Sequence, residues 1–356
     1  MPDVPPTPKL ILRDLTKRYG SSLALEPTSL EVGEGEFLTL LGPSGSGKTT
    51  LLMMIAGLTE PSGGTLLLNG RDLTHLPAYR RDIGVVFQNY ALFPHLSVFE
   101  NIAFPLRMRK WAEGEVENAV AEALDLVQLP YLRDRLPRQL SGGQQQRVAF
   151  ARAIVFKPSL VLMDEPLGAL DKKLRDELKL EIRRIHRELK TTIVYVTHDQ
   201  EEAMLLSDRI CLMNNARVEQ LDAPLALYER PSTRFSATFL GDSNILEGVA
   251  QDSIIRVGGL TLATAHADRL PADGEPIGLM IRPERIRLVA VSGGIPARIE
   301  TVIDLGNTRR ISVIAGEGLT LNVVTMGGGT CPSPGEQVGL EIPAADVVPF
   351  AAVTMA

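Results

Sequence analysis

The chain has 356 residues, of which 44% are hydrophobic and 22% charged, and its formal net charge is −6. This length suits two domains, one of them sizeable, and the acidic balance argues against a dedicated nucleic-acid binder. The two cysteines, Cys211 and Cys331, are far apart and lack metal-ligand spacing, which excludes a disulfide framework.

The N-terminal residues 1–8 are rich in proline and contain no basic region followed by an apolar stretch. We therefore expect no secretory signal and a cytoplasmic protein. No uninterrupted apolar run reaches the length of about 20 residues that a membrane-spanning helix needs. If the protein works at a membrane, we expect another subunit to span it.

From residue 10 to about residue 199, short apolar runs alternate with helical patterns and turn signals. This alternation predicts an α/β domain with a mainly parallel sheet covered by helices. The apolar runs at residues 36–41, 159–163 and 192–197 are each followed directly by polar or glycine-rich sequence. Because ligands of such sheets gather at the carboxyl ends of strands, we expect the functional residues there.

Residues 42–49, Gly-Pro-Ser-Gly-Ser-Gly-Lys-Thr, match the pattern G-x-x-x-x-G-K-[ST] between an expected strand and an expected helix. The glycines let backbone amides close around phosphates, Lys48 reaches the β and γ oxygens, and Thr49 offers its hydroxyl to Mg²⁺. Alone, the motif predicts a phosphate binder. The predicted phosphate-binding residues are Gly42, Pro43, Ser44, Gly45, Ser46, Gly47, Lys48, Thr49 and Thr50.

Asp164 and Glu165 directly follow the apolar run at residues 159–163. At a strand end, the Asp164 carboxylate is expected to lie beside Thr49 and hold Mg²⁺, mostly through water. Glu165 is then expected to polarise the water that attacks the γ-phosphate, while positioning and charge neutralisation carry the rate. An isolated Asp-Glu pair would favour a solvated turn, but the preceding strand and the phosphate loop favour the functional interpretation.

Between residues 88 and 140 the sequence changes to helical patterns with proline breaks, which predicts an inserted helical subdomain at about residues 89–150. Near its end, residues 140–147 read Leu-Ser-Gly-Gly-Gln-Gln-Gln-Arg. The serine and the paired glycines open a helix whose exposed amides can face a phosphate. Together with the first motif, this predicts two copies of the protein that sandwich ATP.

After residue 199 the pattern changes again. Residues 223–240 are expected to form helices that lead into a linker. Beyond residue 241, short alternating runs separated by glycine and proline predict a small β-barrel-like domain. We therefore expect an ATPase domain at residues 1–240 and an all-β domain at residues 241–356. The clearest expected strands are residues 254–257, 277–281, 310–314 and 337–342.

In this order, the motifs of residues 10–240 resemble those of the ATP-binding subunits of ABC transporters. The resemblance implies that Tyr19 stacks on adenine, that Gln88 contacts Mg²⁺ and the attacking water, and that His198 contacts the γ-phosphate. It also places Asp171 in a loop that reaches across a dimer. The family commonly has serine where this chain has Gly168, so we assign Gly168 no catalytic contact.

The resemblance further implies how two subunits meet. Ser141, Gly142, Gly143 and Gln144 of one subunit are expected to close on the γ-phosphate bound by Lys48 of the other. Helix dipole and charge-assisted hydrogen bonds would make ATP hold the homodimer together. Hydrolysis would then separate the halves.

The remaining implications concern partners. In the family, the neighbourhood of residues 89–101 receives a cytoplasmic helix from a membrane-spanning permease subunit. The C-terminal part resembles the OB-like accessory (TOBE) domain of binding-protein-dependent importers, with the turn motif Ile-Arg-Pro-Glu at residues 281–284. We thus expect a peripheral protein on the cytoplasmic face of the inner membrane, which works with permeases and indirectly with a periplasmic or surface solute-binding protein.

The junction at residues 238–248 is most similar to polyamine-type (spermidine/putrescine) members, although ferric-iron, sugar and sulfate importers share the architecture. A soluble ABC-type ATPase that acts on DNA or ribosomes is the alternative from another class. It would need long coiled-coil arms or two tandem cassettes, and the sequence has neither sustained heptads nor a second phosphate loop. A third interpretation makes the chain mainly a regulator with the β-rich tail as its sensor.

Overall fold

The computed structural model describes residues 8–168, 170–252, 254–328 and 331–350. The chain divides into two compact units, one ending at Pro224 and the other beginning at Leu225. The sequence-based boundary lies later, between residues 240 and 241. Within the described ranges, no helix combines the length and the apolar character that crossing a membrane requires.

The centre of the first unit is a six-stranded sheet in the order β10-β9-β3-β8-β7-β6. Strand β3 pairs in parallel with β8 and β9, β7 pairs in parallel with β6 and β8, and β10 pairs antiparallel with β9. The expected strands at residues 36–41, 159–163 and 192–197 are confirmed as β3, β7 and β8. The strands are β3 (Phe37–Leu41), β6 (Ile83–Val86), β7 (Leu160–Asp164), β8 (Ile193–Thr197), β9 (Arg209–Asn214) and β10 (Arg217–Asp222).

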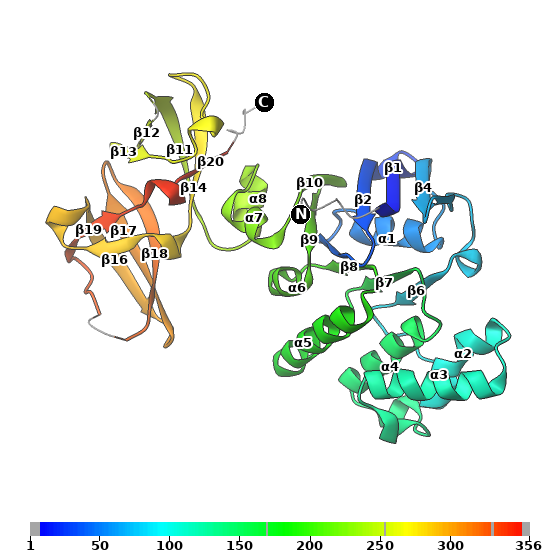
Figure 1. The fold of residues 1–356 in the computed structure, drawn as a ribbon. Coiled ribbons are helices and arrows are strands. Elements are labelled where there is room, and N and C mark those ends of the chain that lie inside the picture. The colour runs from blue at the N-terminus through cyan, green and yellow to red at the C-terminus, as the bar shows by residue number, and fades with distance from the viewer. Residues whose placement is uncertain (1–7, 169, 253, 329–330, 351–356) are drawn as a thin grey trace, which may run out of the picture. The chain divides into compact units, whose positions relative to one another are not determined.

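Helices cover both faces of this sheet, as the apolar runs predict, because strands buried on two sides need apolar residues at every position. Alternate residues of β7 enter two different cores: Val161 and Met163 pack toward α4 and α5, and Leu160 and Leu162 pack toward α1. Figure 1 shows these layers around the sheet. The helices are α1 (Lys48–Ala56), α2 (Val98–Met108), α3 (Glu113–Leu126), α4 (Gly142–Ile154), α5 (Lys172–Leu189) and α6 (Gln200–Leu206).

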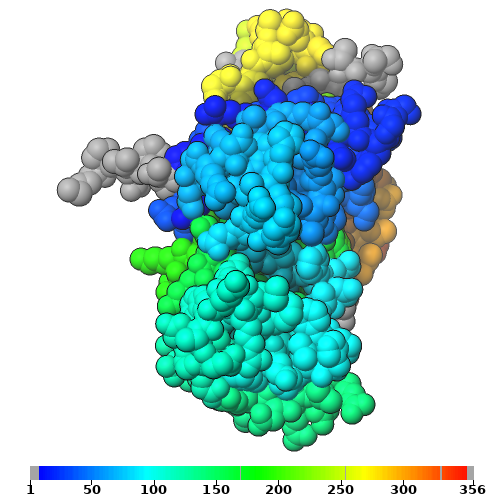
Figure 2. Space-filling model, turned by 90° about the vertical axis from the view of Figure 1, so that its right-hand side faces the viewer, coloured from blue at the N-terminus to red at the C-terminus, as the bar shows by residue number. Residues whose placement is uncertain are grey.

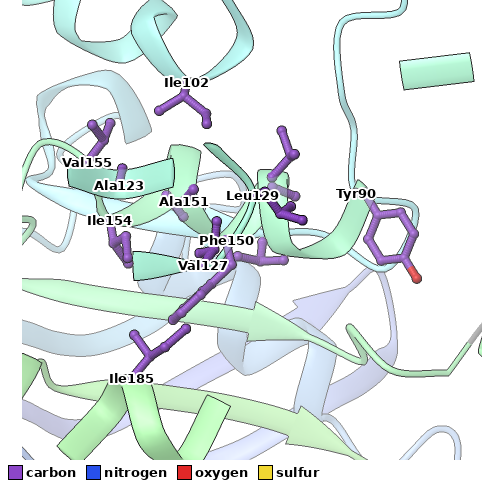
Figure 3. Close-up of a cluster of buried hydrophobic side chains, with 14 of the residues drawn as sticks. Tyr90, Ile102, Ala123, Val127, Leu129, Phe150, Ala151, Ile154, Val155 and Ile185 are labelled. Atoms are coloured by element: carbon purple, nitrogen blue, oxygen red, sulfur yellow. The ribbon is translucent and has the colours of Figure 1, made fainter. Parts of the chain in front are cut away.

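The expected helical insertion is present as α2, α3 and α4. Its apolar side chains join those of the sheet in one core, and Figure 3 shows Ile102 of α2, Ala123 of α3, Phe150 of α4 and Ile185 of α5 in this cluster. On the face drawn in Figure 2, residues of this insertion (cyan to green) lie next to residues of the N-terminal part of the unit (blue). The insertion is therefore packed onto the sheet rather than separate from it.

One part of the first unit differs from the expected mainly parallel sheet. Its N-terminal strands form a separate antiparallel sheet in the order β2-β1-β4-β5. The reason is local: only two residues join β1 to β2 and β4 to β5, and such short connections join antiparallel strands. The second connection is Asn69-Gly70 with positive φ at both residues, a turn typical of hairpins. The strands are β1 (Pro8–Tyr19), β2 (Ser22–Gly33), β4 (Gly63–Leu68) and β5 (Arg71–Asp72).

The second unit begins with the helices α7 (Pro224–Glu229) and α8 (Arg234–Phe239) and continues as two five-stranded antiparallel sheets. Apolar residues of both sheets form one core, which confirms the expected β-rich domain. The first sheet has the order β13-β12-β11-β14-β20, with β11 (Asn244–Gln251), β12 (Ile254–Val257), β13 (Leu260–Ala263), β14 (Pro276–Ile281) and β20 (Val348–Phe350). The second has the order β15-β19-β16-β17-β18, with β15 (Arg287–Val289), β16 (Ile295–Asp304), β17 (Thr308–Ala315), β18 (Leu319–Met326) and β19 (Gln337–Glu341).

Arg282, in the turn motif of residues 281–284, joins the helices α7 and α8 to this β domain. It is 3% exposed, its guanidinium stacks on the Tyr228 ring at 3.9 Å, and its Nη2 donates to the Tyr228 carbonyl at 2.8 Å. Its Nη1 lies within 3.3 Å of three carbonyl oxygens, those of Ala237, Gly241 and Asp242. One buried cation thus satisfies the carbonyl groups at the end of a short helix and in the linker after it.

We expect Arg282→Met to destabilise the second unit by about 3 kcal/mol, because several buried carbonyl groups lose a charged donor together. Thermal unfolding, followed by circular dichroism, measures the loss of stability. Hydrogen exchange of residues 225–243 shows whether the loss begins in the helices and the linker. Arg298→Met on the exposed side of β16 is the matched control. Equal melting temperatures for the two variants would contradict the assignment of Arg282 as the link.

Candidate functional site

The predicted functional residues follow four neighbouring strands at one edge of the parallel sheet. The register pairs Leu41 of β3 with Thr197 of β8, Val196 of β8 with Asp164 of β7, and Met163 of β7 with Val86 of β6. The carboxyl ends of these strands therefore lie side by side. This edge is where ligands of open α/β sheets bind.

The phosphate loop leaves β3 at this edge and leads into α1. Gly42 has φ +155°, and a Cβ there would lie 2.1 Å from the carbonyl oxygen of Met213, so only glycine fits. Gly47 has φ +97° and is the N-cap of α1, which has no side-chain cap and no acidic residue in its first turn. The amides at the start of α1 are thus arranged to accept an anionic ligand.

Lys48 lies within the loop and is 4% exposed. Its Nζ donates to the carbonyl oxygens of Gly42 and Pro43, each at 2.8 Å. Burial lowers the pKa of Lys48, and the carboxylates of Glu165 and Asp164 oppose that change. The ammonium group is therefore held in the concave side of the loop, where a phosphate oxygen would meet it.

Two of the three residues expected to hold a metal are in contact. The Thr49 hydroxyl donates to Asp164 Oδ1 at 3.3 Å. Burial raises the pKa of Asp164, the Thr49 hydrogen bond lowers it, and the neighbouring Glu165 carboxylate raises it further. A hydroxyl and a carboxylate are oxygen ligands of the kind that Mg²⁺ prefers, so the pair fits this cation.

Glu165 and His198 form the next pair along the sheet edge. His198 Nδ1 lies 3.2 Å from Glu165 Oε2, although the histidine is more than half exposed. Glu165 adopts φ +41°, a left-handed backbone conformation that is costly for a residue with a side chain. Its amide donates to the Val196 carbonyl at 3.0 Å, which fixes the turn against β8. A residue held with a strained backbone in this way is typical of a functional position.

Gln88 comes from the loop after β6 and is exposed. A Cβ at Gly168 would lie 4.0 Å from both Gln88 Nε2 and Glu165 Oε2. The side chains of Gln88 and Glu165 therefore both come near Gly168. The backbone of Gly168 would accept a side chain, because its φ is not in the left-handed region and the nearest atom would be 3.5 Å away.

Residues 140–147, which we call the signature motif, and Asp171 both lie at helix starts. Ser141 is the N-cap of α4: its hydroxyl accepts from the Gln144 amide at 3.3 Å, and Gln144 Oε1 accepts from the Ser141 amide at 2.9 Å. This capping box was not anticipated from the sequence, although the S-x-x-Q spacing signals it. Asp171 caps α5 by accepting from the Leu174 amide at 3.0 Å.

Close packing explains why both positions 142 and 143 are glycine. A Cβ at Gly142 would lie 2.9 Å from Leu170, and one at Gly143 would lie 2.9 Å from Leu174. In the part of the chain that the structure describes, no recorded hydrogen bond or ion pair joins residues 141–144 to the phosphate loop. The structure thus brings Thr49, Gln88, Asp164, Glu165 and His198 together but not the signature residues.

Tyr19 lies at the end of β1 and is 55% exposed. The Lys17 ammonium lies 4.9 Å from the centre of its ring. More than half of the side chain is exposed, so the ring can stack on a planar group such as adenine, and this role stays a prediction.

Sequence reasoning missed the residues that support His198. Tyr195 and Thr197 donate to the buried Glu202 carboxylate at 2.9 and 2.7 Å. Burial raises the pKa of Glu202, and these two hydrogen bonds oppose the rise. Thr197 immediately precedes His198, so this network anchors the end of β8. No motif signals it, because the contact depends on how α6 folds back on the strand.

Fold and site together define a P-loop nucleotide-binding protein with an inserted helical subdomain. A family model described as ABC transporter matches residues 25–168, and one described as TOBE domain matches residues 279–350. With the relatives below, these matches show that the chain belongs to the ATP-binding subunits of ABC transporters. It is therefore an ATPase coupled to transport and carries a C-terminal TOBE domain.

Similar proteins cover most of the chain. The spermidine/putrescine import ATP-binding protein PotA of Rubrobacter xylanophilus is 48% identical, over 86% of this chain and 84% of its own. The sulfate/thiosulfate import ATP-binding protein CysA 1 of Chromobacterium violaceum is 46% identical, over 85% of each. The solved structure of cbiO1 from Clostridium perfringens, part of the ABC transporter complex cbiONQ, has a TM-score of 0.57 at 30% identity and covers 61% of this chain and 89% of its own.

Proposed function

We propose that this subunit hydrolyses ATP to energise the import of polyamines, with spermidine and putrescine as solutes. Support comes from relatives named as spermidine/putrescine import proteins, including one of Thermobifida fusca that is 51% identical over 79% of this chain and 75% of its own. Sulfate or thiosulfate is the second candidate, because the CysA 1 relative is nearly as similar. The recognised site handles the nucleotide, so it does not itself distinguish these solutes.

The nucleotide is proposed to bind across residues 42–50, with Lys48 against the β and γ phosphates and Tyr19 against adenine. Mg²⁺ is proposed to be held by Thr49, Asp164 and Gln88, where, when bound, it neutralises phosphate charge. In the described residues no group of three or more His, Cys, Asp or Glu side chains is arranged to hold a metal ion. A site with few protein ligands suits Mg²⁺, which usually keeps phosphate oxygens and waters as its other ligands.

Glu165 is proposed to accept the proton of the water that attacks the γ-phosphate, and Gln88 to orient that water. The 3.2 Å contact between Glu165 and His198 carries this proposal. His198 would hold the γ-phosphate against the carboxylate while the same contact keeps the carboxylate oriented. The chain supplies positioning and charge, which are what phosphoryl transfer requires.

A homodimer is proposed to complete each site, with Ser141, Gly142, Gly143 and Gln144 of one subunit facing the γ-phosphate bound by the other. The capping box uses the Gln144 amide, so the phosphate contact rests on the Gly142 and Gly143 amides and the Ser141 hydroxyl. Asp171 is proposed to contact the partner from the start of α5.

Permease subunits are proposed to bind the helical insertion around residues 89–101, with the ATPase at the cytoplasmic face of the membrane. A periplasmic or surface solute-binding protein would act through the permeases. The chain, its permeases and its binding protein reconstituted in vesicles are expected to hydrolyse ATP faster with spermidine or putrescine and not with sulfate. The rate of ATP hydrolysis is measured as phosphate release in the presence of each solute. If only sulfate increased this rate, sulfate would replace the polyamines as the proposed solute.

A further inference from the structure

Arg175, in the first turn of α5, bridges two loops that the proposed reaction uses. Its Nη2 donates to the Leu170 carbonyl at 3.0 Å, and its Nη1 lies 3.4 Å from Asp199 Oδ2. The side chain is 28% exposed, so the bridge is partly shielded from water. The planar fork of the guanidinium lets one side chain reach both acceptors, which the single ammonium of lysine cannot reproduce.

Asp199, one of the two acceptors of Arg175, belongs to the loop that contains His198. Asp199 directly follows His198, its amide donates to the Thr197 hydroxyl at 3.0 Å, and its Oδ1 accepts from the Glu202 amide at 3.1 Å. The side chain of Asp199 thus caps α6 and pairs with Arg175 at once. Because Asp199 is bonded to His198, a shift of Asp199 also moves His198, which contacts the Glu165 carboxylate.

The acceptor on the other side belongs to the loop between Glu165 and Asp171. Leu170 is buried and packs against Gly142, and Leu174 packs against Gly143. The start of α5 is therefore in contact with the tip of the signature helix. Arg175 therefore connects the start of α4, which carries the signature motif, to the His198 loop of the same subunit.

Polar contacts join these two loops at the protein surface. A cavity of about 380 Å³ opens beside them, and its lining is polar and charged, including Arg175, Lys179 and His198. Directed hydrogen bonds and ion pairs therefore add to the buried apolar core in fixing the position of one loop relative to the other. A second ion pair, from Lys179 of α5 to Glu201 of α6 at 3.3 Å, joins two helix residues and includes no residue of either loop.

We propose that Arg175 is a positioning residue that sets His198 relative to Leu170 and the start of α5. It thereby links the signature tip, which serves the partner's nucleotide, to the subunit's own γ-phosphate contact. This inference rests on the proposed roles of His198 and the homodimer. It assigns Arg175 no contact with the nucleotide itself.

The test compares Arg175→Gln, Arg175→Lys, Asp199→Asn and the double variant Arg175→Gln/Asp199→Asn in the full chain. Asparagine keeps the cap of α6 and removes the charge. Loss of Arg175 is expected to lower kcat for ATP by about 10- to 100-fold, as small displacements of catalytic groups do, and to leave KM nearly unchanged. Lysine should restore part of the rate, and the double variant should be no slower than the slower single variant. Glu201→Gln, which breaks the neighbouring ion pair, is the control.

Hydrogen exchange provides a readout that does not depend on activity. In Arg175→Gln, the amides of Asp199 and Glu202 should exchange faster, while those of β8 stay protected. Unchanged exchange at these amides, additive losses in the double variant, or an equal effect of Glu201→Gln would overturn the proposal. A wild-type chain that hydrolyses no ATP would instead count against the proposed function, and the exchange result would still decide the role of Arg175.

Discussion

Replacing Glu165 with glutamine is expected to lower ATP hydrolysis by about 10²- to 10³-fold, because a general base of this kind contributes that much to a rate. ATP binding should survive, since the loop backbone and the hydrogen bonds from Lys48 to the carbonyls of Gly42 and Pro43 do not involve Glu165. The glutamine is close in size to glutamate and can keep its place beside His198. With hydrolysis blocked and ATP bound, a stable dimer should accumulate.

The dimer is measured by size-exclusion chromatography with light scattering in the presence and absence of ATP, and hydrolysis by phosphate release. Glu177→Gln, an equivalent change at an exposed position of α5, is the control for the loss of one carboxylate. A Glu165→Gln chain that binds ATP and stays monomeric would argue against the sandwiched nucleotide. Unchanged hydrolysis would remove Glu165 from the proposed mechanism.

The site on the sheet edge could be predicted because its residues are tied to strands and to glycine geometry. The sequence placed Asp164 and His198 directly after buried strands, and parallel pairing makes the ends of neighbouring strands coincide. Gly42 and Gly47 mark backbone conformations that other residues rarely adopt. These constraints are local, so one sequence suffices to find them.

Other features depend on contacts between distant segments and could not be predicted from a pattern. Arg175 carries no motif, and its side chain reaches Asp199 only when α5 and α6 pack side by side. The role of Arg282 as a link is equally invisible, although the turn motif that contains it was recognised. The antiparallel N-terminal sheet had a local signal in Asn69-Gly70, which the alternation of strands and helices obscured.

Two roles assigned from the family resemblance coexist with structural roles in this chain. Ser141 and Asp171 each cap a helix, and they are also the residues proposed to face the other subunit. Capping fixes the start of a helix and therefore the direction in which its first amides point. The same side chains can thus hold the signature tip in position before a partner is present.

Lys48→Ala is expected to remove both ATP binding and hydrolysis, which separates it from Glu165→Gln. The loss of charge-assisted hydrogen bonds to phosphate should weaken ATP binding by about 100-fold, or about 3 kcal/mol. Isothermal titration with ATP measures binding, and thermal unfolding tests the fold, because the Lys48 ammonium also donates to the loop carbonyls of Gly42 and Pro43. Lys48→Met keeps more of the buried chain and should lose binding equally while unfolding closer to wild type. If ATP bound either variant as tightly as the wild-type chain, the loop of residues 42–50 would not be the nucleotide site, and the dimer built around it would lose its basis.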